Sequence, residues 1–288
     1  FDFKDGALAA EVSGISGAAC QNAVPDRSVL KLVKGGKLEA ALKAACGGVA
    51  TAEAFKLPPA VENIVSGGAS PDDFSLENAR DGITITAEGT AEHASTPEKG
   101  DNALWKTLGL LAAYNGVIGS KNVVGIYETL CTPLATEKLG IYVDDPKSGD
   151  LTACMSMADI KDGTLSLTVD FRLPLGVSAE SVAQAVENKL GCKANILDYH
   201  PNLFIDEDAP LIKTLLKVYR GITGDMTAPL KTGGGTYARE LPNAVAFGCT
   251  PLDIDINMHR ADENFPVAQL FKNFEIYYAA AVALAEEK

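Results

Sequence analysis

The sequence predicts an α+β fold, in which alternating strands are mixed with amphipathic helices. Residues 83–89 alternate apolar and polar side chains, as a half-buried strand does. Residues 151–160 and 164–172 also alternate, on either side of an Asp-Gly pair at 162–163, and Asp-Gly is typical of a tight hairpin turn. Residues 102–114 repeat apolar side chains at helical spacing.

The same patterns predict the remaining elements in order. Strands are expected in residues 1–13 (one or two, with a turn), 28–33, 193–199, 229–232 and 244–247. Helices are expected at 37–45, 121–130, 178–190, 209–219 and 267–285. Asp101 is placed to cap the helix of residues 102–114, and Ser178 to cap its own helix. Paired prolines and glycines make residues 51–80 the least regular part of the chain.

Composition limits the function classes. The chain has 288 residues, of which 47% are hydrophobic and 22% charged, which is typical of a globular protein. A formal net charge of −13 argues against nucleic acid or an anionic membrane as a partner. No run approaches the ~18 apolar residues of a membrane-spanning helix, and no leader sequence opens the chain. The six scattered cysteines form no C-x-x-C pair, so we expect reduced thiols and a cytoplasmic location.

Two segments carry residues suited to chemistry. The first is a glycine-rich turn, Gly233-Gly234-Gly235-Thr236-Tyr237-Ala238-Arg239, followed by Met258-His259-Arg260-Ala261-Asp262-Glu263. Its glycines allow a ligand to approach closely, and the amides of Gly234, Gly235 and Thr236 are suited to bind a carboxylate. His259 is a candidate metal ligand. The structural alternatives are an ordinary turn and a surface histidine.

The second segment is Ala91-Glu92-His93-Ala94-Ser95-Thr96-Pro97-Glu98, with Gly100, Asn102 and Ala103 after it. Read together, the two segments resemble the co-catalytic zinc dipeptidases and aminoacylases, in particular the PepV-like bacterial dipeptidases with a long inserted lid. The resemblance implies that His259 binds the second of two zinc ions. It also implies that His93 points a ring nitrogen at the scissile carbonyl oxygen, where a preorganised donor contributes roughly 3–4 kcal/mol. The alternative for His93 is a loop residue that caps the following helix.

Two further residues match the lid of that family. Arg172, in Val169-Asp170-Phe171-Arg172-Leu173-Pro174, resembles the residue that grips the substrate carboxylate, to which a guanidinium donates two parallel hydrogen bonds. Its alternative is a salt bridge at a strand end. Asn22, in Asn22-Ala23-Val24-Pro25, is similar to the asparagine of the family's N-x-x-P segment, which approaches the substrate. Its alternative is a turn residue.

The resemblance covers nearly the whole chain, but only the later part of such an enzyme. It implies a lid domain at residues 1–203, possibly of two α/β subdomains, and the C-terminal portion of a catalytic α/β domain at 204–288. The family's other zinc ligands come from H-x-D, D-D-K, Glu-Glu and Asp segments that precede the lid, and these are absent here. We therefore expect part of a cytoplasmic zinc dipeptidase for short peptides, inactive without an N-terminal catalytic segment. The alternatives are an aminoacylase or N-acyl-amino-acid deacetylase, and a non-catalytic binding module.

Overall fold

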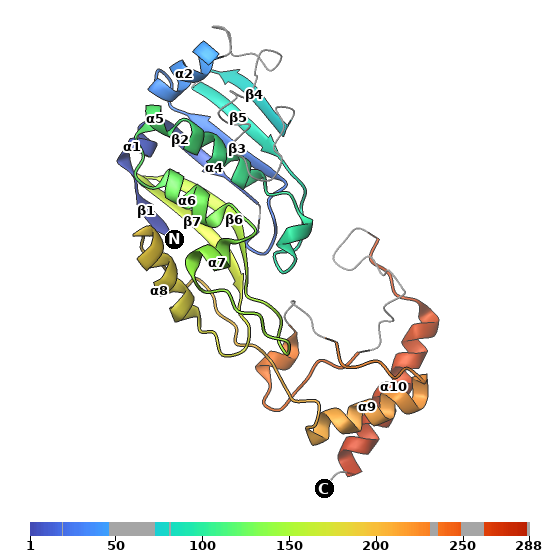
Figure 1. Ribbon diagram of the computed structural model, residues 1–288. Helices are drawn as coiled ribbons and strands as arrows, with labels where there is room; N and C mark the ends of the chain where they lie inside the picture. The colour runs from blue at the N-terminus through green and yellow to red at the C-terminus, as the bar shows by residue number, and fades with distance from the viewer. Residues whose placement is uncertain (19, 46–72, 81, 231–235, 249–261, 287–288) are drawn as a thin grey trace. The chain divides into compact units, whose positions relative to one another are not determined.

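The computed structural model describes residues 1–18, 20–45, 73–80, 82–230, 236–248 and 262–286. The chain divides into two compact units, unit 1 (Phe1–His200) and unit 2 (Pro201–Lys288) (Figure 1). Helices and antiparallel sheets are combined in the fold, which confirms the predicted α+β class. None of the helices in the described ranges is both long enough and apolar enough to cross a membrane.

One sheet of unit 1 has four antiparallel strands. Their order is β2 (Val12–Ser16), β3 (Arg27–Leu32), β5 (Gly82–Glu88) and β4 (Phe74–Ala79). Leu30 pairs with Ile85 across β3 and β5, and both side chains are buried. Strand β4 lies within residues 51–80, the segment predicted to be the least regular part of the chain, of which residues 51–72 lie outside the described residues. Phe74 and Leu76 do alternate with polar residues, but the run is too short to outweigh the breakers before it.

The other sheet has the order β1 (Asp2–Lys4), β7 (Thr164–Arg172) and β6 (Thr152–Lys161). The predicted hairpin of β6 and β7 is confirmed. Its turn residues Asp162 and Gly163 have φ values of 49° and 73°, the left-handed pair that a type I′ turn requires. A backbone hydrogen bond of 2.8 Å from Ala18 N to Ser156 O joins the end of β2 to β6 and so links the two sheets.

The helices of unit 1 complete one shared hydrophobic core. In the described part of this unit they are α1 (Gly6–Ala9), α2 (Lys37–Ala45), α4 (Ala103–Ala113), α5 (Asn115–Ile118), α6 (Val123–Leu130), α7 (Ala135–Leu139) and α8 (Ala179–Leu190), with a 3-10 turn η2 (Pro97–Lys99). Helix α4 is the central one, because it contacts β3, β5 and β6 and thus strands of both sheets (Figure 1). Leu104, Leu108 and Leu111 of α4 are fully buried in this core.

The cap of α4 is Asn102, so the prediction of Asp101 is wrong by one residue. Asn102 Oδ1 accepts hydrogen bonds from the amides of Leu104 at 3.0 Å and Trp105 at 3.3 Å. Its Nδ2 also donates to Met155 O at 2.7 Å, which ties the helix start to β6. Because the helix begins at Ala103, Asp101 lies one position too early to accept from the first-turn amides.

Two other predicted features of unit 1 have different outcomes. The cap of α8 is confirmed, since Ser178 Oγ accepts from Ser181 N at 3.1 Å. The strand at residues 193–199 is wrong, because only Lys193 pairs, in an isolated bridge with Asp2. A strand requires a continuous hydrogen-bonded neighbour, and β1 is only three residues long.

The described residues of unit 2 form α9 (Pro210–Thr223), a 3-10 turn η3 (Tyr237–Glu240) and α10 (Val267–Glu286). Helices α9 and α10 pack on each other and bury Leu215, Ile276 and Ala280. The strand predicted at residues 244–247 is wrong, since these described residues form no ladder with any other described segment. The predicted strand at 229–232 is not seen at residues 229–230, and its remainder lies outside the described residues.

Candidate functional site

His93 lies in the loop between β5 and α4, where the exposed ring is oriented by its own loop. The backbone amide of Ser95 donates a hydrogen bond to His93 Nδ1 at 3.2 Å. Ser95 Oγ lies 2.7 Å from the same nitrogen. An amide N–H can only donate, so this contact favours the tautomer in which Nδ1 accepts and Nε2 carries the proton. His93 therefore presents an Nε2–H donor from an exposed ring.

A second segment pairs with this loop. Two backbone hydrogen bonds, of 2.8 and 2.9 Å, join residues 22–24 to residues 92–94. Ala23 and His93 face each other in an antiparallel bridge, and the carbonyl of Asn22 accepts one of the two bonds. Adjacent residues of an extended segment point to opposite sides. The pairing thus brings the backbone of Asn22 to the His93 loop, while the two side chains leave the bridge on different sides.

A small apolar cluster of Val24, Ala94 and Cys154 connects the paired segments to β6. Cys154 is opposite Asp170 in the β6–β7 ladder. Burial is the main reason that the pKa of the Cys154 thiol is raised to about 12. The negative charge of Asp170 acts in the same direction, and the positive charge of Arg172 opposes both. The cluster therefore lies next to both the His93 loop and the charged pair.

That charged pair is Asp170 and Arg172, near the end of β7. Arg172 Nη2 donates to Asp170 Oδ2 at 2.8 Å, and the two residues share one face of the strand because they are two positions apart. The salt bridge considered as the alternative for Arg172 is thus present. A guanidinium has five N–H donors in a fixed plane, so it can bind a neighbouring carboxylate and a second one together. Asp170 thus holds one end of the Arg172 guanidinium.

The backbone segments of Asn22 and His93 and the Asp170–Arg172 pair therefore all lie next to one small cluster, although the Asn22 and His93 side chains leave their bridge on opposite sides. The sequence analysis missed Ser95 and Asp170 as the residues that orient His93 and Arg172. Both can be found from spacing, because Ser95 follows His93 by two positions and Asp170 precedes Arg172 by two. The catalytic and substrate-binding roles of the predicted residues stay predictions.

The predicted residues of the glycine-rich turn are in unit 2. Thr236 is half-buried and immediately precedes η3. Gly234, Gly235 and His259 lie outside the described residues. Within the described ranges, no group of three or more His, Cys, Asp or Glu residues is placed to hold a metal ion. A protein zinc site takes three or four ligands, so these residues alone do not fit the zinc ions that the family resemblance implies.

The chain is similar to proteins named "Putative dipeptidase". The relative from Staphylococcus epidermidis is 32% identical over 210 residues, which is 71% of this chain and 45% of the relative. Two relatives from Staphylococcus aureus, strains MRSA252 and USA300, are 30% identical over 211 residues, 72% of this chain and 45% of their own length. The matched part thus spans less than half of each relative. No protein-family model matches the chain.

Proposed function

We propose that this chain is part of a dipeptidase that hydrolyses short peptides with a free amine, and that Asn22, His93 and Arg172 belong to its substrate site. The similarity to the staphylococcal proteins supports this proposal over about 70% of the chain. The position of the Asn22 segment, the His93 loop and the Asp170–Arg172 pair next to one cluster supports it independently. The lid assignment of residues 1–203, the two zinc ions and the cytoplasmic location are parts of the same proposal.

The observation that carries the proposal is the hydrogen bond from the Ser95 amide to His93 Nδ1. When water adds to a peptide carbonyl, negative charge develops on the carbonyl oxygen, and a preorganised N–H donor there stabilises the transition state. His93 has such a donor at Nε2, because the Ser95 amide occupies Nδ1. An imidazole with its proton on Nε2 is suited to donate from that atom and not to coordinate a metal through it.

Arg172 supplies the second part of the proposed site. The dipeptide's terminal carboxylate would bind the guanidinium, which Asp170 holds in place. Asn22 would contact the substrate from the segment paired with the His93 loop. In unit 2, the amides of Gly234, Gly235 and Thr236 remain candidates for a further carboxylate contact, and His259 remains the candidate zinc ligand. Other metal ligands would come from a segment beyond this chain.

A substrate panel tests the proposal in the full-length, metal-loaded protein. Unblocked dipeptides should be hydrolysed, and N-acetyl-amino acids should react at least about 100-fold more slowly in kcat/KM. The reverse preference would support an aminoacylase or N-acyl-amino-acid deacetylase. Binding of peptides without hydrolysis of either class would contradict an enzymatic role and support a binding module.

A further inference from the structure

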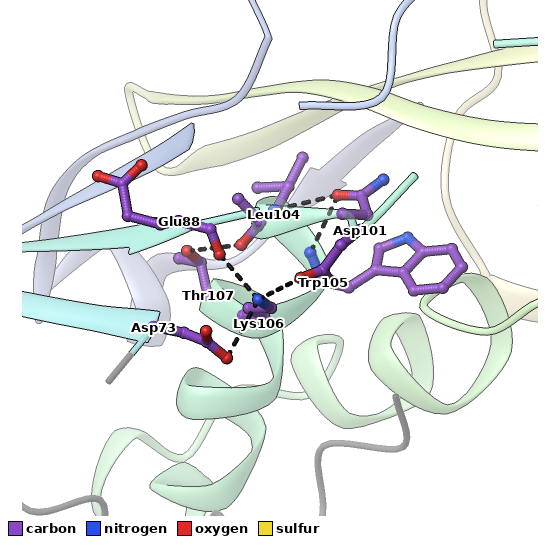
Figure 2. Close-up of polar contacts among 9 residues, drawn as sticks. Asp73, Glu88, Asp101, Leu104, Trp105, Lys106 and Thr107 are labelled. Atoms are coloured by element: carbon purple, nitrogen blue, oxygen red, sulfur yellow. Dashed lines mark hydrogen bonds and ion pairs between the residues drawn. The ribbon is translucent and has the colours of Figure 1, made fainter. Parts of the chain in front are cut away.

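A single buried lysine holds both ends of the loop that carries His93. Lys106 is on the first turns of α4, and its side chain is only 5% exposed. Its Nζ donates to the carbonyl oxygen of Glu88 at 2.8 Å and to Asp101 Oδ2 at 2.6 Å. Glu88 is the last residue of β5, where the loop begins, and Asp101 is near its end. Figure 2 shows these contacts converging on the ammonium group.

The third partner of Lys106 is outside the loop. Asp73 Oδ2 lies 3.1 Å from Nζ, and Asp73 directly precedes strand β4 (Figure 2). An ammonium group has three N–H donors, and these three oxygen atoms match that number. The two carboxylates neutralise the buried charge, but they attach it to different parts of the fold. Of the two carboxylates, only that of Asp101 belongs to the loop.

The backbone at the two ends of the loop is tightly packed. Thr90 and Asp101 exchange two backbone hydrogen bonds of 2.9 and 3.0 Å. A Cβ atom at Gly89 would lie 2.1 Å from Asp101 O, so no side chain fits there without a shift of the backbone. The ends are also joined to the segment after Asn22, since Gly89 N donates to Asp26 O at 2.7 Å. A movement of Asp101 would therefore reach both ends of the loop.

We infer that Lys106 is a positioning residue for His93, and that it acts through Asp101. The inference rests on the proposed function for the role of His93. The contacts of Lys106 with Glu88 O and Asp101, here called the clamp, are independent of that role. A buried charged group costs free energy unless it is fully paired, and apolar replacements are often as stable. The side chain of Asp101 is about half exposed, and its short contact with Lys106 Nζ attaches the end of the loop to this buried charge. Lys106 fixes where the Nε2–H of His93 lies by closing the loop on both sides.

Amide hydrogen exchange on the purified chain separates this role from general stabilisation. Asp101→Ala removes the loop partner of Lys106, and Asp73→Ala is the matched control that removes a carboxylate outside the loop. The Thr90 amide donates to Asp101 O across the loop ends, and the Ala94 amide donates to Asn22 O. In Asp101→Ala both amides should exchange about 10-fold faster or more. In Asp73→Ala they should keep their protection relative to the amides of the β6–β7 hairpin.

Lys106→Met should speed the exchange of the same two amides as much as Asp101→Ala does. If Lys106→Met does not fold, the comparison of Asp101→Ala with Asp73→Ala decides the inference. Equal exchange in the two alanine variants, or no change in Asp101→Ala, would overturn the inference whatever the enzyme activity.

A second test uses the full-length protein. Asp101→Ala should lower kcat for a dipeptide about 10-fold with little change in KM, and should have no further effect when His93 is already alanine. A loss that adds fully to that of His93→Ala would overturn the link to His93. Absence of peptidase activity in the unmodified protein would instead contradict the proposed function, and the exchange experiment would still decide the clamp.

Discussion

At the scale of single residues, the site depends on short-range partners that orient each side chain. Ser95 selects the proton position of His93, and Asp170 holds Arg172. Both partners are two positions away in sequence, so each pair forms within one loop or one strand. The orientation of these groups is therefore set by local contacts.

Replacing Arg172 tests its contact with the substrate. Arg172→Lys keeps the charge but removes the planar set of donors, so kcat/KM for a dipeptide should fall on the order of 100-fold. The corresponding dipeptide amide has no carboxylate and should lose far less. Steady-state kinetics on the two substrates measures the difference.

The control for this change is thermal unfolding. A partly exposed salt bridge contributes at most about 1 kcal/mol, so the melting temperature should shift by a few degrees only. Equal kinetic losses on acid and amide substrates, or a much larger drop in melting temperature, would show that Arg172 is structural.

At the scale of secondary-structure elements, the Cys154 cluster and the α4 cap hold the site segments in place. Cys154 connects β6 to the paired segments, and Asn102 connects the start of α4 to the same strand. Each contact joins residues far apart in sequence. These are the contacts that should be most sensitive to partial unfolding of the site.

Thiol labelling measures the integrity of the Cys154 cluster. With a pKa raised to about 12 by burial, Cys154 should react with iodoacetamide at pH 8.5 only after unfolding, whereas the exposed Cys20 should react at once. Because the folded-state pKa is above the value of about 9 in the unfolded chain, the stabilising contribution is complete below pH 9 and declines between pH 9 and 12. Peptide mapping by mass spectrometry identifies the labelled sites. Equal labelling of the two thiols in the native chain would show that the cluster is open.

Two variants compare how much the N-cap residues of α4 and α8 contribute to the free energy of unfolding. Asn102→Ala removes the bonds to two α4 amides and to Met155 O from a buried position, and should cost about 2–3 kcal/mol. Ser178→Ala removes the one bond to Ser181 N from an exposed position and should cost about 0.5–1 kcal/mol. Urea denaturation measures both. A smaller loss for Asn102→Ala than for Ser178→Ala would contradict the packing described for α4.

The elements that the sequence predicts well are those with local signals. The β6–β7 hairpin follows from Asp162-Gly163, and α2 follows from its apolar spacing, with the bounds Lys37–Ala45. Strand β4 was not predicted because its alternating run of six residues is short and follows several helix and strand breakers. It is a strand because it pairs with β5. The strand predicted at 244–247 fails for the opposite reason, since an apolar run becomes a strand only beside another strand.

The candidate site was predictable residue by residue, but its assembly was not. Asn22, His93 and Arg172 are recognisable from motifs, whereas their grouping depends on the bridge of Ala23 with His93 and on the pairing of Cys154 with Asp170. Such pairings depend on tertiary structure, because nothing in the separate segments specifies the register between them.

At the scale of the whole molecule, the described residues form two linked sheets in unit 1 and two packed helices in unit 2, and several apolar side chains of unit 2 are exposed. On α10 these include Phe271, Phe274 and Tyr278, which are 67–71% exposed. An exposed apolar helix face of this size is typical of a surface that packs against further protein. It is consistent with the proposal that an additional segment completes the catalytic domain.

The chain by itself should therefore lack peptidase activity and bind zinc weakly. One candidate histidine ligand is too few for a zinc site, so dialysis against zinc followed by metal analysis should give much less than one ion per chain. Activity on unblocked dipeptides should be absent from the same preparation. Tight stoichiometric zinc uptake would contradict this account of the chain.

The central claim, that His93 donates a hydrogen bond to the reacting carbonyl, is tested most directly by His93→Ala in the full-length protein. The account predicts that kcat for an unblocked dipeptide falls by roughly 10²–10³ while the bound metal content, measured on the same sample, is unchanged. Loss of metal together with activity would show that His93 is a ligand, and an unchanged kcat would show that it has no part in the reaction.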